Sequence, residues 1–326
     1  MKTPSFVAVA FCGLLAIGTA SAAVITVDTV NNISPGAGRT SLKQALSQAQ
    51  AGDTIAFNIP GTGPHFIATP PEGYPYIMVD NLTIDGYTQP GSAPNSNSIL
   101  SPNNAQIQIV LDSRNGNYTT MDYDPAGGSP GYGDSEAAIL GIVDAKNVHV
   151  RGLSFLGVPA VGTSQDISLY FISFARYASD GHISGCWLGV APDGVTVAGA
   201  ADGITAFRIT GEETIDGTII GVAPSTTEDF AATVAQFNVI VGCPAIPIII
   251  EGARTRISGN FLMVMPDGLH DYNTTLIPEF EGMFEGAIEI GRKGDNTLIG
   301  VDGDGFNDAN ERNVIGGALP PSLGGY

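Results

Sequence analysis

Short apolar segments, separated by polar or glycine-containing turns, recur along the second half of the chain. A phrase that places a glycine before an apolar segment begins near residue 150, and its glycines recur at intervals of roughly 30 to 40 residues. A second apolar segment precedes each copy by a short turn. The copies of the phrase cover residues 150–155, 183–188, 215–220, 257–262 and, more weakly, 298–301, and the preceding segments cover 139–143, 169–174, 206–209, 246–250 and 287–290. This pattern predicts a repeat of strand, tight turn, strand and longer loop.

Strands of this length cannot bury an apolar side alone, and no amphipathic helices lie between them to cover it. Successive copies are therefore expected to stack in parallel, which gives each backbone N–H and C=O group a partner in the next copy. We predict an all-β fold, a right-handed parallel β-helix. A β-sandwich is the alternative, but it would favour two-residue hairpin loops directly between its strands, and few lie in that position.

The N-terminal part differs from the repeats. Residues 1–22 have Lys2, then an apolar run from Phe6 to Ile17, then small residues, which is typical of a signal peptide cleaved after Ala22. Residues 42–49 carry apolar side chains at helical spacing and precede a strand at 54–59. A short amphipathic helix here would cap the open end of the stack.

Three parts of the chain follow from these patterns. Residues 1–22 are the predicted signal peptide, 23–60 the N-terminal cap with the first strand, and 61–326 the β-helix, interrupted by a Gly/Tyr/Asp-rich insertion near 112–135. The sequence stops just after a repeat begins, so we expect the β-helix to continue in, or to be truncated from, a longer parent protein.

Several of these segments resemble one family. Residues 25–28, 41–46 and 53–61 are similar to the opening segment of large bacterial secreted right-handed parallel β-helix repeat proteins, and 82–91 is similar to the strand and turn that follow it. The Ser-Gly-Cys-Trp-Leu-Gly-Val phrase at 184–190 and residues 311–317 resemble repeats of that family. The resemblance implies an exported or surface protein with no particular reaction, because a fold does not specify a function.

Composition and charge narrow the classes of partner. The formal net charge is −19, and such a surface repels nucleic acid and anionic lipid, which bind through Lys and Arg. No apolar run of the mature chain reaches the roughly 20 residues of a membrane-spanning helix. Beyond the signal segment the only cysteines are Cys186 and Cys243, which are expected as buried thiols rather than a disulfide framework.

The strongest acidic cluster lies between Asp302 and Glu311. Aligned with a twelve-residue calcium loop, Gly305 falls on the turn glycine, and the ligand positions three, five, nine and twelve are occupied by Asp302, Asp304, Asp308 and Glu311. Gly300 stands where the first acidic ligand belongs. The sequence therefore allows a Ca²⁺ site, and the alternative is a polar turn at a corner of the stack.

Parallel β-helices often carry lyases and glycosidases, which use paired carboxylates or a basic residue beside them. If the strands align as predicted, Arg208, Glu251 and Glu289 approach one face. Among four isolated histidines His182, close to Asp180, is the candidate for acid–base chemistry. Solvated charges on the outer surface are the alternative for Arg208, Glu251 and Glu289. Tyrosines such as Tyr74, Tyr76 and Tyr87 would either stack on sugar rings or plug local turns.

Scaffold-like repeats without a specific catalytic motif favour a non-enzymatic secreted or cell-surface module. Its loops would serve adhesion or contact with extracellular matrix or glycans. The rival hypothesis is a carbohydrate-active enzyme, a polysaccharide lyase or glycosidase, with a groove along one parallel sheet.

Overall fold

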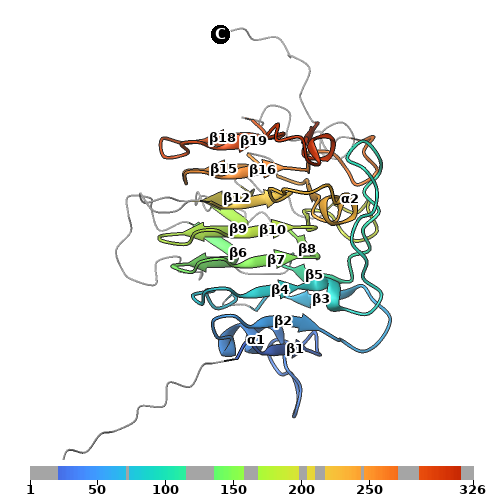
Figure 1. Ribbon diagram of the computed structural model, residues 1–326. Helices are drawn as coiled ribbons and strands as arrows, with labels where there is room; N and C mark the ends of the chain where they lie inside the picture. The colour runs from blue at the N-terminus through green and yellow to red at the C-terminus, as the bar shows by residue number, and fades with distance from the viewer. Residues whose placement is uncertain are drawn as a thin grey trace, which may run out of the picture.

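A computed structural model describes residues 21–70, 73–114, 136–157, 168–197, 204–209, 217–243, 246–270 and 286–316. Most of the predicted signal peptide, and most of the insertion predicted near 112–135, lie outside these residues. The described chain consists mainly of short strands in three parallel sheets with few helices (Figure 1). The all-β class with parallel sheets is therefore confirmed, and the pairing differs from that of an antiparallel β-sandwich.

We name the sheets A, B and C and give their strands in chain order. Sheet A holds β1 (Val24–Val27), β2 (Thr54–Phe57), β4 (Thr83–Asp85), β7 (His149–Arg151), β10 (His182–Ser184), β13 (Ile219–Gly221), β16 (Arg256–Ser258) and β19 (Leu298–Ile299). Sheet B holds β3 (His65–Ala68), β5 (Ile109–Asp112), β8 (Leu153–Leu156), β11 (Trp187–Leu188), β14 (Asn238–Ile240), β17 (Asn260–Leu262) and β20 (Val314–Ile315). Sheet C holds β6 (Glu136–Val143), β9 (Ser168–Ala175), β12 (Ile204–Ile209), β15 (Ile248–Ile250) and β18 (Ile288–Ile290). From β7 onward the chain visits A, B and C in turn, and we call three such consecutive strands a layer.

The recurring glycine phrase is a corner rather than one strand. Gly152 separates β7 from β8 with a φ of +68°, and Gly259 separates β16 from β17 with the same φ. Side chains other than glycine rarely adopt this conformation. The phrases at 150–155, 183–188 and 257–262 therefore each supply a strand to sheet A and another to sheet B, whereas those at 215–220 and 298–301 supply only the sheet-A strands β13 and β19. A layer thus has three strands instead of the two expected from the sequence.

Stacked aliphatic side chains form the core. In sheet A the register aligns Ile55, Ile84, Val150, Ile183 and Ile220 in one column, and all five are fully buried. Each layer thus covers the apolar side chains of the layer before it, which removes apolar surface from water along the whole stack.

A ladder of asparagines lies at the corner between sheets A and B in the later layers. The Asn238 Nδ2 donates to the Oδ1 of Asn260 at 3.0 Å, and the Asn260 Nδ2 donates to the Oδ1 of Asn313 at 3.0 Å. The amides of Asn238, Asn260 and Asn313 also each donate to a backbone carbonyl of the sheet-A strand one layer earlier, respectively Ile183, Ile220 and Ile257. The side-chain amides satisfy buried backbone groups where the chain turns and the β-ladder cannot.

Two α-helices lie among the described residues. The helix α1 (Leu42–Gln48) begins with a capping box, in which the Ser41 side chain accepts from the Gln44 backbone and the Gln44 side chain accepts from the Ser41 backbone. Its apolar side chains Leu42, Ala45 and Leu46 are buried. The second helix is α2 (Phe230–Val234). Neither helix has the length and apolar character needed to cross a bilayer.

Candidate functional site

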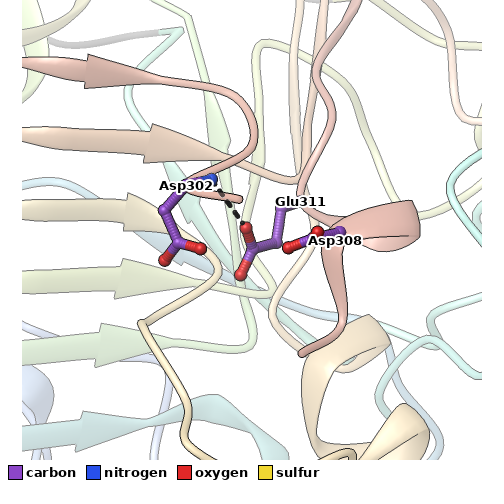
Figure 2. A group of neighbouring side chains, drawn as sticks. All are labelled: Asp302, Asp308 and Glu311. Carbon is purple, nitrogen blue, oxygen red and sulfur yellow. Dashed lines mark hydrogen bonds between the residues drawn. The ribbon is translucent and has the colours of Figure 1, made fainter. Parts of the chain in front are cut away.

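Three of the four predicted calcium ligands come together. Asp302 follows β19, Asp308 begins the 3-10 helix η4 (Asp308–Asn310), and Glu311 follows that helix. One oxygen from each lies within 4.8 Å of the others, and the Asp302 backbone N–H donates to the Glu311 carboxylate (Figure 2). Asp304 does not join them, since its Oδ1 accepts the Phe306 N–H within the same loop. The predicted twelve-residue spacing therefore gives a three-carboxylate cluster.

Arg256, which the sequence did not single out for this site, reaches the same cluster from β16. Its Nη1 lies 2.6 Å from an Asp302 oxygen, and its Nη2 lies 2.7 Å from a Glu311 oxygen. Its Nε donates to the Val222 carbonyl at 2.9 Å, and only 9% of the side chain is exposed. The Arg256 guanidinium therefore compensates the negative charge of the partly buried Asp302 and the buried Glu311.

The two carboxylates respond differently to this arrangement. Burial raises the pKa of Glu311, and the hydrogen bond from Asp302 and the charge of Arg256 only partly offset it. Burial acts in the same direction on Asp302, but hydrogen bonds from Arg256 and the Asp304 backbone outweigh it and hold the pKa of Asp302 below its usual value. Of these two carboxylates, Glu311 is thus the one whose charge is more costly.

The donor set can be compared with what Ca²⁺ requires. Ca²⁺ takes six to eight oxygen ligands, and the buried Oδ1 of Asp308 has no hydrogen-bond partner within the described structure. Asp302, Asp308 and Glu311 would be its protein ligands. However, Arg256 already contacts two of these three carboxylates. The arrangement fits an ion-pair cluster around a guanidinium better than a resident cation, because Ca²⁺ would have to displace Arg256.

Of the residues predicted for acid–base chemistry, Arg208 and Glu289 lie in sheet C and Glu251 directly follows β15 of that sheet, but the three do not form a compact set. The register pairs Arg208 with Ile249 and Ile249 with Glu289, so one strand separates the two charged residues. At the usual strand spacing their backbones are about 10 Å apart. Glu251 follows β15 and is half-buried, whereas Glu289 is exposed. In backbone register Arg208 and Glu289 thus occupy corresponding positions, with Ile249 between them.

His182 makes a cross-strand contact in sheet A. Its ring lies edge-on to that of His149, with centroids 5.4 Å apart, and its Nε2 is 2.8 Å from the Gly221 carbonyl oxygen. A carbonyl can only accept, so the Nε2 carries the proton. Burial lowers the pKa of His182 to about 4, against the opposing effect of the Gly221 hydrogen bond. His182 is therefore neutral near pH 7 and joins two layers.

Two tyrosines considered for sugar stacking are buried or nearly so. The hydroxyl of Tyr74 accepts from the Asn32 side chain at 3.0 Å. The hydroxyl of Tyr87 donates to the Gly185 carbonyl at 2.8 Å, and burial raises the pKa of Tyr87. Both rings serve as local plugs, which is the alternative that the sequence left open for them.

A long connection between sheets A and B is the feature that sequence reasoning missed. Residues 92–106 fold back on themselves through mutual backbone hydrogen bonds between Ala93 and Gln106. In Figure 1 this teal segment runs along the edge of the stack, from the level of β4 and β5 toward the last layers. The signal in the sequence for this ordered connection was its high content of Asn, Ser and Pro, but the same composition is also typical of an ordinary loop.

Three contacts, each far apart in sequence, fix this connection to the stack. Asn95 donates through Nδ2 to the Val234 carbonyl at 2.9 Å, and the Asn103 N–H donates to the Pro266 carbonyl at 2.7 Å. The Ile99 N–H donates to the Asn310 side chain at 3.3 Å. We call residues 92–106, with the turn at 264–270 that they contact, the loop ridge.

No protein-family model matches the chain, and no curated protein sequence matches it either. The resemblance to bacterial β-helix repeat proteins therefore stays a prediction. Function has to be argued from the geometry described above.

Proposed function

We propose that the protein is a secreted or cell-surface right-handed parallel β-helix that presents the loop ridge to an extracellular glycan or matrix partner, without catalysing a reaction. From β7 onward the chain visits sheets A, B and C in a constant order, which supports a helical winding of the chain, because each layer needs the next one to bury its apolar side chains. In this proposal α1 caps the first layer, and its three buried apolar side chains support that role. The N-terminal apolar run and the acidic composition support export.

The observation that carries the functional proposal is the fixation of the loop ridge. A connection of this length between two short strands is usually functional when it is ordered. Here buried asparagine side chains, Asn95 and Asn103, hold its backbone in one conformation. A preorganised surface loses less entropy on binding than a mobile loop does.

The ridge combines apolar and amide groups at its exposed face. Leu100 is 77% exposed, and Leu269 in the contacting turn is also exposed. The two segments touch, since a Cβ placed on Gly268 would lie 3.9 Å from Ser101. Asn97 and Asn104 are held by hydrogen bonds within the ridge, which orients their amides. Apolar side chains beside oriented amides suit the alternating apolar and hydroxyl surfaces of a sugar chain.

The positions of the acid–base candidates are a weaker basis for proposing a function. Arg208 and Glu289 lie in one column of sheet C with an isoleucine between them. A hydrolase requires two carboxyl groups about 5 to 9.5 Å apart across one bond. The enzyme hypothesis is therefore treated as an outcome of the test.

The test is binding to a panel of immobilised extracellular polysaccharides and matrix proteins. We expect the wild-type chain to bind a subset, and the double variant Leu100→Asp, Leu269→Asp to bind at least about tenfold more weakly, because a charge at each apolar contact must be desolvated. Ile33→Asp is the matched control, since Ile33 is 76% exposed near the opposite end of the chain. Binding unaffected by the double variant, or release of sugar products from the panel, would overturn the proposal.

A further inference from the structure

Two histidines lie side by side on the outer face of sheet A, in the middle of the stack. His149 of β7 and His182 of β10 are partners in the parallel register, and their ring centroids are 5.4 Å apart. Side chains alternate between the two faces of a sheet, and the next residues along, Val150 and Ile183, are fully buried in the core. Both strands have sheet-A neighbours on either side (Figure 1), so the pair does not depend on an end of the stack.

The hydrogen bonds of both rings fix which nitrogen carries the proton. The His182 Nε2 is 2.8 Å from the Gly221 carbonyl oxygen, which can only accept. The His149 Nε2 is 2.9 Å from the Oδ1 of Asn147, and the Nδ2 of the same amide donates to the Oδ1 of Asn81 at 2.9 Å. Each neutral ring therefore holds its proton on Nε2 and keeps a lone pair on Nδ1. Among the described residues, neither Nδ1 has a hydrogen-bond partner.

Both rings are neutral at pH 7, which is the form that binds metal ions. Burial lowers the pKa of His182 to about 4. Burial and the charge of Arg151 lower the pKa of His149. A metal ion that binds at pH 7 therefore does not have to displace a proton from either ring.

The charges around the pair leave room for a cation. Arg151 lies two residues beyond the pair on β7, but its guanidinium is bonded to the carboxylate of Asp85, which compensates its charge. Thr83 and Ile219, which are uncharged, occupy the register positions on either side of the two histidines. The exposed Asp180 directly precedes the turn into β10 and adds a negative charge. The net charge of −19 also favours a cation over an anion at this face.

We propose that His149 and His182 form a binding site for a divalent transition-metal ion of the zinc type, held by the two Nδ1 atoms and completed by water. Zn–N bonds of about 2 Å in tetrahedral geometry put the centres of two imidazole rings on one ion about 5 Å apart, which agrees with the observed ring separation. Metal-ligating histidines usually donate their other ring N–H to an oxygen acceptor, and both Nε2 atoms do so here. The site is separate from the loop ridge, so it does not rest on the function proposed above.

Isothermal titration calorimetry of the purified chain with Zn²⁺ at pH 7, without a histidine tag, tests this site. We expect one ion per chain with a dissociation constant of about 100 µM or tighter. His149→Gln removes one of the two ligands and should weaken binding at least about tenfold, with an unchanged circular dichroism spectrum. His270→Gln is the matched control, since His270 is exposed in the turn after β17, and it should leave the affinity unchanged. X-ray absorption of the zinc-loaded wild-type chain should show two imidazole ligands.

Three results would overturn the proposal. The first is a wild-type chain that binds no Zn²⁺ at about 1 mM ion. The second is an affinity that His149→Gln leaves unchanged, because the ion would then lie elsewhere. The third is an absorption spectrum with oxygen ligands alone, which would place the ion at the acidic cluster, and this measurement does not depend on the folding of any variant.

Discussion

Asn260 is the position at which one substitution tests the asparagine ladder most directly. Its side chain is fully buried, its Nδ2 donates to the Ile220 and Ser258 carbonyls and to the Asn313 side chain, and its Oδ1 accepts from Asn238. Asn260→Leu has a similar volume but removes all four contacts. Each hydrogen bond contributes about 1 kcal/mol net, and each buried group left without a partner costs about 1 to 3 kcal/mol.

The expected loss follows from which partners keep another bond. The Asn238 Nδ2 still donates to the Ile183 carbonyl, so it is not orphaned. The Asn313 side chain still accepts from the Asn260 backbone N–H. The Ser258 carbonyl still accepts from the Val222 N–H, whereas the Ile220 carbonyl loses its contact with this amide. The added apolar contacts of leucine offset part of the cost. We therefore expect the free energy of unfolding to fall by about 3 kcal/mol.

Urea unfolding followed by fluorescence measures this loss. Trp187 is the only tryptophan of the chain and is buried in β11, the sheet-B strand that pairs with β14 of the ladder. Gln50→Ala, at an exposed position after α1, is the control and should change stability by less than about 0.5 kcal/mol. A loss below about 1 kcal/mol for Asn260→Leu would refute the reasoning, since it would mean that the ladder amides contribute no more than surface groups.

Three further outcomes are expected. The pKa of His182 is lowered to about 4, so the folded state binds fewer protons than the unfolded chain at pH values between 4 and 6.5. The stability that His182 contributes above pH 6.5 is therefore lost as the pH falls toward 4. His182→Gln should flatten this slope in urea titrations at pH 7 and pH 5. Wild-type melting temperature should change by less than about 1 °C between Ca²⁺ and chelator, whereas Arg256→Met, which leaves the carboxylate cluster without its cation, should be stabilised by Ca²⁺. Gly152→Ala should destabilise the chain by several kcal/mol in thermal melts, since the φ is +68° and the new Cβ would lie 2.7 Å from Tyr87. Gly303→Ala, where no atom lies close to the new Cβ, should cost only about 1 kcal/mol.

Each of these outcomes has a result that contradicts it. An unchanged pH slope in His182→Gln would show that the buried ring does not titrate with folding. A large Ca²⁺ effect on the wild-type chain would favour a resident ion over the guanidinium. Equal effects of the two glycine substitutions would mean that the contact between Gly152 and Tyr87 is unimportant.

The strands could be predicted from the sequence because each layer repeats the same local sequence pattern. An apolar segment of a few residues, a turn and a glycine recur at matched intervals, and only parallel stacking buries them. The glycine phrase was nevertheless interpreted as one strand, whereas Gly152 and Gly259 turn the chain between sheets A and B. Periodicity shows that a segment is apolar, but it does not show where a positive φ redirects the chain.

The acidic cluster could be predicted in part because its residues are close together in the sequence. Asp302, Asp308 and Glu311 lie within one loop, so their spacing alone brought three of the four predicted ligands together. Asp304 turned away because a nearer backbone N–H competes for its carboxylate. Arg256 was not predicted at this place, since it lies 46 residues from Asp302 and arrives through the register of β16 with β19.

The sequence by itself determined the class of the fold and the sign of the surface charge, because both depend on composition and on spacing within a few residues. The tertiary structure decided which side chains meet: the asparagine ladder, the guanidinium among the carboxylates, and the anchoring of residues 92–106 at Val234, Pro266 and Asn310. These contacts join residues from different layers, and their partners are selected by strand register and corner geometry rather than by neighbours along the chain.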